Sequence, residues 1–138
     1  MNSHRLADLR LGMTDRFEVR ITTGMMEKFL DVTGDSNPLH TDLDFARAAG
    51  YADRVVYGML TASFYSTLVG VYLPGRFVLL HGVDASFAAP VLPGDLLTVR
   101  GEVSSVNQEL KLVDMRAHIT NQNGVKVSRA KIRMGVRE

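Results

Sequence analysis

The stretch Gly58-Met-Leu-Thr-Ala-Ser-Phe-Tyr-Ser-Thr-Leu-Val-Gly-Val-Tyr72 determines the architecture that we expect for this chain. On a helix its apolar side chains would point in almost every direction, and Pro74-Gly75 ends the run. A helix that is apolar on most sides is normally buried on most sides. The sequence therefore predicts a long central helix, from Gly58 to about Tyr72, that other elements surround.

The second half of the chain supplies those elements. Residues 77–80 and 84–88 are short runs typical of strands, and residues 96–106, 110–120 and 125–136 carry the alternating apolar pattern of longer strands. Residues 16–21 alternate in the same way, and Asn123-Gly124 is typical of a hairpin turn. This pattern predicts an α+β fold, an antiparallel sheet wrapped around the central helix, in one domain over residues 1–138.

Two short helices are expected between the first strand and the central helix. Thr22 or Thr23 can cap a helix that ends at Gly34, because a threonine oxygen accepts a free N–H and glycine adopts the left-handed cap. Thr41 can cap a second helix over residues 42–49. Between the two helices, the segment from Ser36 to Pro38 has the composition of a turn.

The composition excludes several classes of protein. The chain contains no cysteine, which rules out disulfides and thiol nucleophiles, and its four histidines have no structural zinc spacing. No apolar run is long enough for a membrane span, and no apolar signal core follows the N-terminus. We therefore expect a cytoplasmic protein that does not insert into a membrane.

The charge distribution does not favour binding to nucleic acid. The net charge is +1, with both signs interspersed along the chain. The basic run from Lys126 to Arg133 alternates with apolar residues, which is typical of the solvated face of a strand. A small ligand that bears phosphate could still use a few of these cations.

The segment that leads to His40 holds the residues best suited to chemistry. Asp35 and His40 stand five residues apart across a turn that Asn37 and Pro38 fix. A carboxylate and an imidazole aimed at one point can hold and deprotonate a water molecule. Alone, Asp35 could bond its own backbone in a turn, and His40 could flank a helix with a carbonyl partner. Their joint spacing favours catalysis.

The run Gly34-Asp-Ser-Asn-Pro-Leu-His40 resembles the signature of the MaoC-like hydratases, a family that includes the (R)-specific enoyl-CoA hydratases. The resemblance continues at Tyr57-Gly-Met-Leu60, at Phe87-Ala-Ala-Pro-Val91 and at Pro93-Gly-Asp95, so it covers nearly the whole chain from about Arg16. It implies the hot-dog fold, which agrees with the central helix and the surrounding sheet.

The resemblance also implies roles for particular residues. Asp35 and His40 match the pair that activates water, and Asn37 matches the residue that helps to hold their loop. Gly58 matches the position whose backbone N–H polarises the thioester carbonyl, since a helix N-terminus presents free donors to a developing oxyanion.

Three further positions follow from the same comparison. Ser66 stands where relatives carry a serine near the catalytic aspartate, and Val69 matches a position near the end of the acyl tunnel. The chain departs from the pattern at Tyr57, where many relatives place histidine. A tyrosine at this position leaves the backbone N–H of Gly58 unchanged. The departure therefore affects the polarity of the pocket and the range of substrates.

The activity that the resemblance implies is the reversible hydration of trans-2-enoyl-CoA to (R)-3-hydroxyacyl-CoA, a lyase reaction of fatty acid metabolism. It calls for no metal and no cofactor, because the CoA thioester is the substrate. We also expect a homodimer or a higher homo-oligomer, since exposed strand edges are usually paired or covered.

Other functions stay open at this point. The nearest is a dehydratase that acts on thioesters of an acyl carrier protein or of a specialised metabolite. A non-catalytic acyl-binding or scaffolding subunit is a further alternative, against which the presence of both Asp35 and His40 speaks. A thioesterase on the same fold is disfavoured because the hydratase motif is intact.

Overall fold

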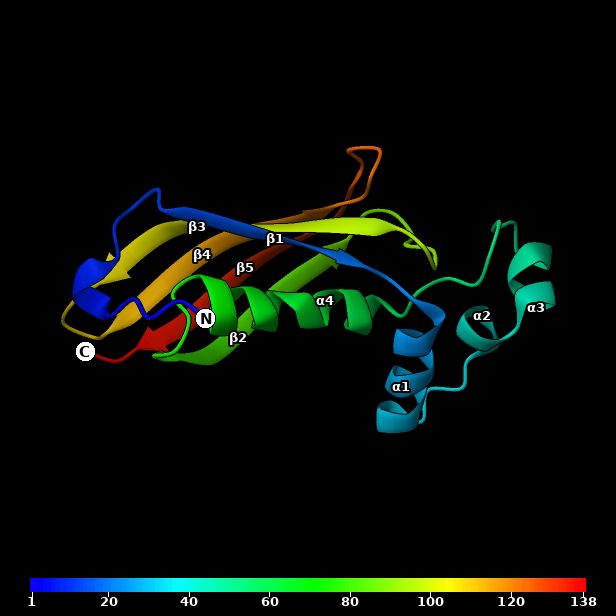
Figure 1. Cartoon of the computed structure of the whole chain (residues 1–138), viewed down its shortest axis with the longest axis horizontal. Coiled ribbons are helices and arrows are strands. Elements are labelled where there is room, and N and C mark those ends of the chain that lie inside the picture. The colour runs from blue at the N-terminus through cyan, green and yellow to red at the C-terminus, as the bar shows by residue number, and fades with distance from the viewer.

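The central helix forms as the sequence predicts. In the computed structural model, which describes residues 1–138, α4 runs Gly58–Thr67 and continues as a π-helical segment, Leu68–Tyr72. Tyr65 and Leu68 are fully buried on this helix. Figure 1 shows α4 lying along one face of the sheet. The apolar run therefore provides the core against which the strands pack.

Five antiparallel strands make one sheet: β1 (Thr14–Arg20), β2 (Val78–Phe87), β3 (Leu96–Asn107), β4 (Leu112–Thr120) and β5 (Lys126–Val136). Their order is β1-β3-β4-β5-β2, so β1 and β2 are the edges. The prediction of two separate strands over residues 77–80 and 84–88 is wrong. The two segments form one strand that pairs with β5 throughout, and a bulge between Leu80 and Gly82 shifts the register of the pairing.

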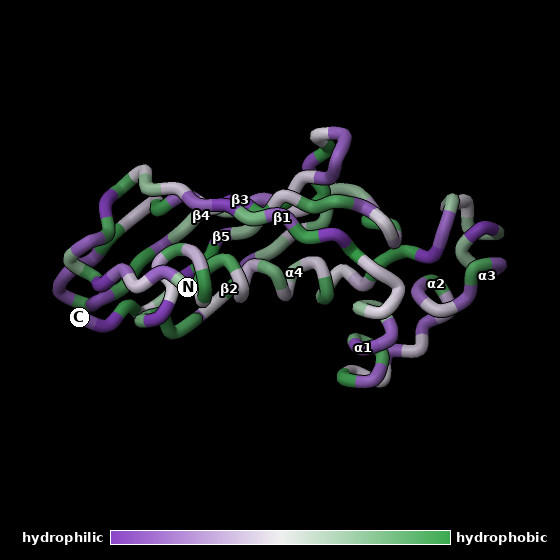
Figure 2. The backbone as a smooth tube through the Cα atoms, in the orientation of Figure 1, coloured by the Kyte–Doolittle hydropathy of each residue, from purple (hydrophilic) through white to green (hydrophobic).

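The two faces of the sheet differ sharply. On β3, Leu97, Val99 and Val103 point to the helix side and are buried, whereas Arg100 and Glu102 point outward and are exposed. In Figure 2 the hydrophobic colour recurs along α4 and along the strands, where it is interspersed with hydrophilic colour. We call the face that packs on α4 the inner face and the opposite one the outer face.

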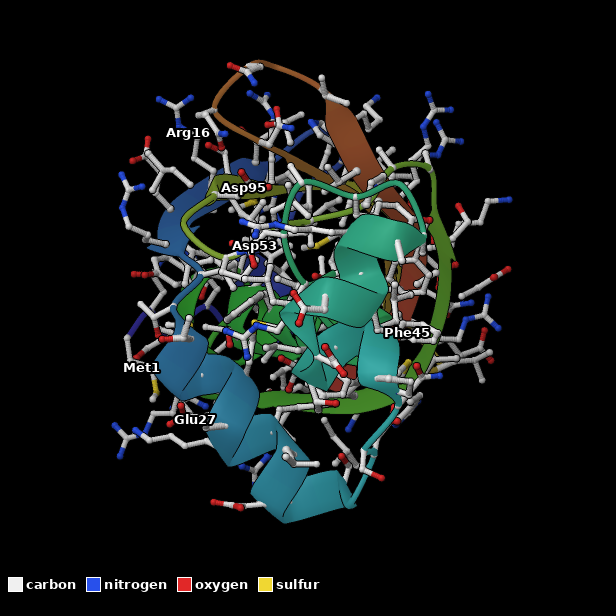
Figure 3. All side chains as sticks on the ribbon, turned by 90° about the vertical axis from the view of Figure 1, so that its right-hand side faces the viewer. Met1, Arg16, Glu27, Phe45, Asp53 and Asp95 are labelled. Carbon is white, nitrogen blue, oxygen red and sulfur yellow. The ribbon has the colours of Figure 1, made fainter.

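The remaining helices are η1 (Leu6–Asp8), α1 (Thr23–Thr33), α2 (Pro38–Thr41) and α3 (Leu43–Ala48). Helices α1 to α3 lie together at one end of the sheet, and Figure 3 views the molecule from that end. No helix in the molecule is both long enough and apolar enough to cross a membrane.

The caps of these short helices follow the sequence in part. Thr22 accepts the N–H of Met25 and caps α1, and Gly34 ends that helix with φ of 70°. Asp42, rather than Thr41, caps α3, because the Asp42 carboxylate accepts the N–H of Phe45. Pro38, expected in a turn, is instead the first residue of α2. Proline is tolerated there because the N–H at the first helical position has no partner inside the helix.

Candidate active site

The loop between α1 and α2 is held by its own side chains. The N–H of Asn37 donates to Oδ1 of Asp35 at 3.2 Å, and Oδ1 of Asn37 accepts the N–H of Leu39 at 2.9 Å. Asn37 thus caps α2 and fixes the position of the Asp35 carboxylate. The second oxygen of that carboxylate has no partner within the protein, so it is free to accept a hydrogen bond from a bound molecule.

His40 is oriented by the segment that precedes α4. Its Nδ1 lies 2.6 Å from the carbonyl oxygen of Val55. A carbonyl oxygen can only accept, so Nδ1 carries the hydrogen and Nε2 of the neutral ring is left as an acceptor. This is the arrangement that a base for a water molecule requires.

Tyr57 connects the two residues. Its hydroxyl donates to the backbone carbonyl of Asp35 at 2.8 Å, and its ring stacks on His40 with centroids 4.2 Å apart. The ring of Phe29 also packs on Tyr57, with centroids 4.8 Å apart. Burial and the charge of Asp35 raise the pKa of Tyr57, against a smaller lowering by Arg54. The phenol therefore stays protonated and keeps donating.

A cavity of about 370 Å³ brings the predicted residues together. Asp35, His40 and Gly58 all line it, with Tyr57 and Phe87 among the other walls. An apolar cavity of about 390 Å³ shares His40, Gly58 and Phe87 with it and extends toward residues 87–91. A reacting group can thus contact the Asp35–His40 pair while an apolar chain occupies the neighbouring space.

Gly58 has the position that an oxyanion donor needs. It is the first residue of α4, where N–H groups have no partner inside the helix, and no side chain caps this end. A Cβ added at Gly58 would lie 3.5 Å from the ring of Phe87, and both residues line both cavities. Glycine therefore keeps the approach to the free N–H open.

Thr61 is a residue that the sequence did not single out. Its side chain is 2% exposed, lines the apolar cavity, and its Oγ1 has no hydrogen-bond partner. A buried hydroxyl without a partner costs free energy, so a group bound in the cavity is a natural partner for it. Only the folded structure shows that this hydroxyl is unpartnered.

Ser66 and Val69 do not join this cluster within one chain. Ser66 is exposed on α4 and lies eight residues beyond Gly58, about 12 Å along the helix axis. Val69 is 1% exposed within the core and lines neither of the two cavities. The supporting role of Ser66 and the tunnel role of Val69 stay predictions.

Comparison with known proteins gives a consistent result. An (R)-specific enoyl-CoA hydratase of Aeromonas caviae is 33% identical over 116 residues, which are 84% of this chain and 87% of that protein. A 3-hydroxybutyryl-CoA dehydratase of Methylorubrum extorquens is 32% identical over 102 residues, 74% of this chain and 65% of that protein. The unliganded R-hydratase of Pseudomonas aeruginosa superposes with a TM-score of 0.91 at 28% identity, covering 97% of this chain and 86% of that one.

The family model described as MaoC like domain matches residues 10–127, a range that includes Asp35, His40 and Gly58. This match extends over most of the strands and all of α1 to α4. The fold, the site and the relatives therefore agree, and the chain belongs to the family of MaoC-like domains.

Proposed function

We propose that this protein is an (R)-specific enoyl-CoA hydratase, a hydro-lyase that adds water to a trans-2-enoyl thioester. The observation that carries the proposal is the shared cavity of Asp35, His40 and Gly58, beside which Nδ1 of His40 is bonded to the carbonyl of Val55, so that Nε2 is left for a bound water. The names of the Aeromonas caviae and Pseudomonas aeruginosa relatives support the same reaction.

The chemistry follows from the positions of these groups. A water molecule held between Asp35 and His40 loses a proton to the pair while its oxygen bonds to the β-carbon. The electrons of the double bond move toward the thioester oxygen, where the free N–H of Gly58 stabilises the growing negative charge. A proton then returns to the α-carbon from the same side, which completes the addition of one water.

The decisive experiment follows crotonyl-CoA by the loss of its enoyl absorbance and determines the chirality of the product. We expect the (R) product. Asp35→Asn and His40→Ala should each reduce kcat by at least about 100-fold with the fold intact, the scale of positioned acid–base groups. Asp31→Asn, on the exposed side of α1, serves as a control with the same chemical change. A predominantly (S) product, or full activity in either folded variant, would refute the assignment.

The direction of the reaction is open to a matched assay. A relative named 3-hydroxybutyryl-CoA dehydratase is consistent with the reverse reaction. Because a catalyst accelerates both directions, (R)-3-hydroxybutyryl-CoA should give crotonyl-CoA with the same dependence on Asp35 and His40. The same variants thus serve both assays.

We further propose that the protein works as a homodimer. Met59 on α4 and Leu80, Val83 and Phe87 on β2 are 67%, 37%, 40% and 48% exposed. They form an apolar strip beside the unpaired edge of β2, on the inner face. A second copy that pairs its own β2 with this edge would continue the sheet and cover the strip.

The same pairing affects the site. Met59 and Phe87 belong to the strip and also line the cavity of Asp35 and His40, so the partner would complete the wall of that cavity. Ser66 lies two helical turns after Met59 and is exposed on the same side of α4. A supporting role for Ser66 therefore requires the second copy.

A further inference from the structure

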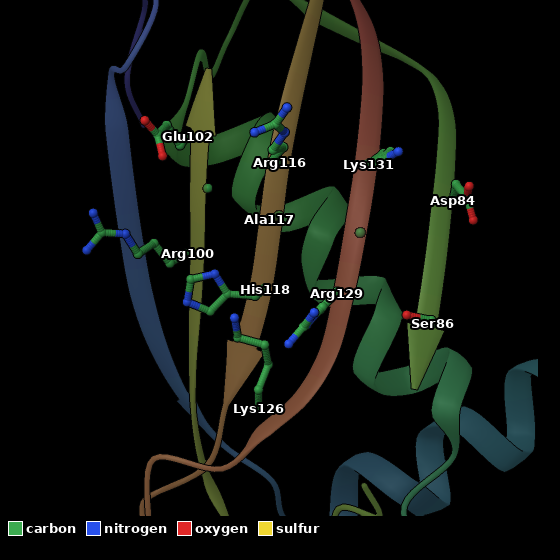
Figure 4. A pocket seen from close by; sticks show the side chains of 12 residues that line it. Asp84, Ser86, Arg100, Glu102, Arg116, Ala117, His118, Lys126, Arg129 and Lys131 are labelled. Atoms are coloured by element: carbon green, nitrogen blue, oxygen red, sulfur yellow. The ribbon is translucent and has the colours of Figure 1, made fainter. Parts of the chain in front are cut away.

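The outer face of the sheet carries a hollow of about 420 Å³, which Figure 4 shows from close by. Five basic side chains and two carboxylates line it: Arg100, Arg116, Lys126, Arg129 and Lys131, with Asp84 and Glu102. The chain as a whole has a net charge of only +1. The surplus of three positive charges is therefore a local property of this face.

The strand register places two of the three surplus charges, those of Arg100 and Arg129, in one row across the sheet. Arg100 on β3 lies opposite His118 on β4, which lies opposite Arg129 on β5, and Arg129 lies opposite Ser86 on β2. Figure 4 shows these side chains on successive strands, with α4 behind the sheet. Because neighbouring strands are about 4.8 Å apart, the three basic residues stand within about 10 Å of one another. On β1 the register adds Arg16 beyond Arg100.

In the next row of the same face the positive and negative charges balance, whereas in the row through His118 they do not. There, Glu102 lies opposite Arg116 and Asp84 lies opposite Lys131. The row through His118 contains no carboxylate, and none of the basic side chains in the hollow forms an ion pair within 4.0 Å. Arg16 and Arg100 in this row are directly opposed, and like charges on directly opposed residues destabilise a sheet. An anionic ligand would remove this repulsion.

His118 responds to these surroundings. Partial burial lowers its pKa, and the charges of Lys126, Arg100 and Arg129 lower it further. The imidazole is therefore mostly neutral at neutral pH and keeps one N–H to donate. A phosphate placed between the two arginines would find two guanidinium groups and one ring donor.

We propose that the row of Arg100, His118 and Arg129 binds the phosphate groups of a nucleotide-type ligand. The hollow has the size of a small-ligand site, and guanidinium groups match phosphate oxygens in a bidentate way. The phosphates can belong to the CoA part of the substrate or to a separate nucleotide. The proposal of a phosphate site does not depend on the proposed hydratase activity. Only the assignment of these phosphates to the CoA substrate rests on that activity.

The position of the hollow favours the CoA part of the substrate as the source of the phosphates. Ser86 lines the hollow on the outer face, and the next residue, Phe87, lines both cavities of the candidate active site on the inner face. Only the end of β2 separates the two places. A thioester held at Gly58 could therefore extend its carrier past this end of the strand toward the row.

Calorimetric titration with CoA and with adenosine 3′,5′-bisphosphate, at fixed ionic strength, tests the site without any turnover. Wild type should bind both ligands, and Arg100→Gln and Arg129→Gln should each raise Kd by about tenfold or more, the effect of losing a charged hydrogen bond. Arg133→Gln is the matched control, since it removes one charge from the same face outside this hollow. Absence of binding in wild type, or equal weakening by the control, would overturn the proposal.

Kinetics with crotonyl-CoA and with crotonyl-pantetheine, which lacks phosphates, separate the two sources. If the row binds the substrate's carrier, Arg100→Gln and Arg129→Gln raise KM about tenfold for the CoA thioester alone. If the row binds a separate nucleotide, the variants leave KM unchanged for both thioesters, while the loss of phosphate-ligand binding in calorimetry persists. If the variants raise KM only for an acyl-carrier-protein thioester and neither phosphate ligand binds, this face binds an acidic protein and the proposal is refuted.

Discussion

Tyr57 links the parts of the candidate site at the scale of single residues. It is the only side chain that both donates to Asp35 and stacks on His40, and it precedes the free N–H of Gly58 in the chain. Its hydroxyl bonds the backbone of Asp35 rather than the carboxylate. Tyr57 is thus a positioning residue, which acts on the reaction through the two groups that it holds.

We expect Tyr57→Phe to reduce kcat between about threefold and tenfold with little change in KM, which is the effect of one lost hydrogen bond. Tyr65→Phe is the matched control, because the Tyr65 hydroxyl donates to Ser128 at 2.8 Å in the core, away from the cavities. Both variants should lose similar stability in urea. Equal losses of kcat in the two variants would show that Tyr57 has only a structural role.

Thr61 offers a prediction in which stability and activity move in opposite directions. Thr61→Val keeps the shape of the side chain and removes the buried hydroxyl that has no partner. The free energy of unfolding should rise by about 1 kcal/mol. If the hydroxyl bonds a group in the cavity, kcat/KM should fall by about tenfold.

Thr67→Val, at the end of the same helix and outside both cavities, provides the control. Urea unfolding and crotonyl-CoA kinetics measure the two effects on one preparation. A Thr61→Val protein that is less stable than wild type and equally active would contradict this account of the residue.

At the scale of elements, packing between the helix and the sheet depends on a glycine in β3. A Cβ at Gly101 would overlap Met115 and lie 2.8 Å from Leu68, and both of these side chains are buried. Gly101→Ala should therefore lower the free energy of unfolding by about 1–3 kcal/mol, the usual cost of overpacking. Gly82→Ala in β2, where nothing lies within 4 Å, should change it little.

Urea denaturation of these two glycine variants measures the difference directly. A Gly101→Ala protein as stable as wild type would mean that Leu68 and Met115 can move aside at no cost. In that case the close packing of the π-helical segment on β3 would not require a glycine at position 101.

The elements show how far the sequence alone could lead. The all-round apolar run predicted α4, and alternation predicted β3, β4 and β5 to within two residues at each end. The bulge that unites the two halves of β2 could not be predicted, because it depends on pairing with β5. The cap of α3 was misplaced by one residue, since Thr41 and Asp42 are both good capping residues.

The same limit applies to the sites. Asp35, Asn37 and His40 lie within six residues, so their convergence could be predicted from a local turn. Tyr57 reaches Asp35 across 22 residues, and the unpartnered state of Thr61 exists only in the folded chain. The row of Arg100, His118 and Arg129 depends on the register of three strands, β3, β4 and β5, which alternation does not specify.

At the scale of the whole molecule, several large apolar side chains stay exposed to solvent. Only 30 of the 138 residues are buried, and helices α1 to α3 extend from one end of the sheet (Figures 1 and 3). Met59 and Phe87 remain partly exposed although they line the candidate active site. A single chain therefore leaves the site open on one side, which a second copy would close.

The last prediction tests this closure. Val83 lies in the middle of β2 and is 40% exposed, so Val83→Asp would place a charge in the proposed interface without lining the catalytic cavity. Wild type should be a dimer by light scattering at micromolar concentration, whereas Val83→Asp should be a folded monomer. Its kcat/KM for crotonyl-CoA should fall at least about tenfold, because an open cavity admits water and weakens the electrostatic stabilisation at Gly58. Leu110→Asp, at a position 63% exposed in the turn between β3 and β4, should change neither mass nor rate. A wild-type monomer with full activity would show instead that one chain forms the complete site.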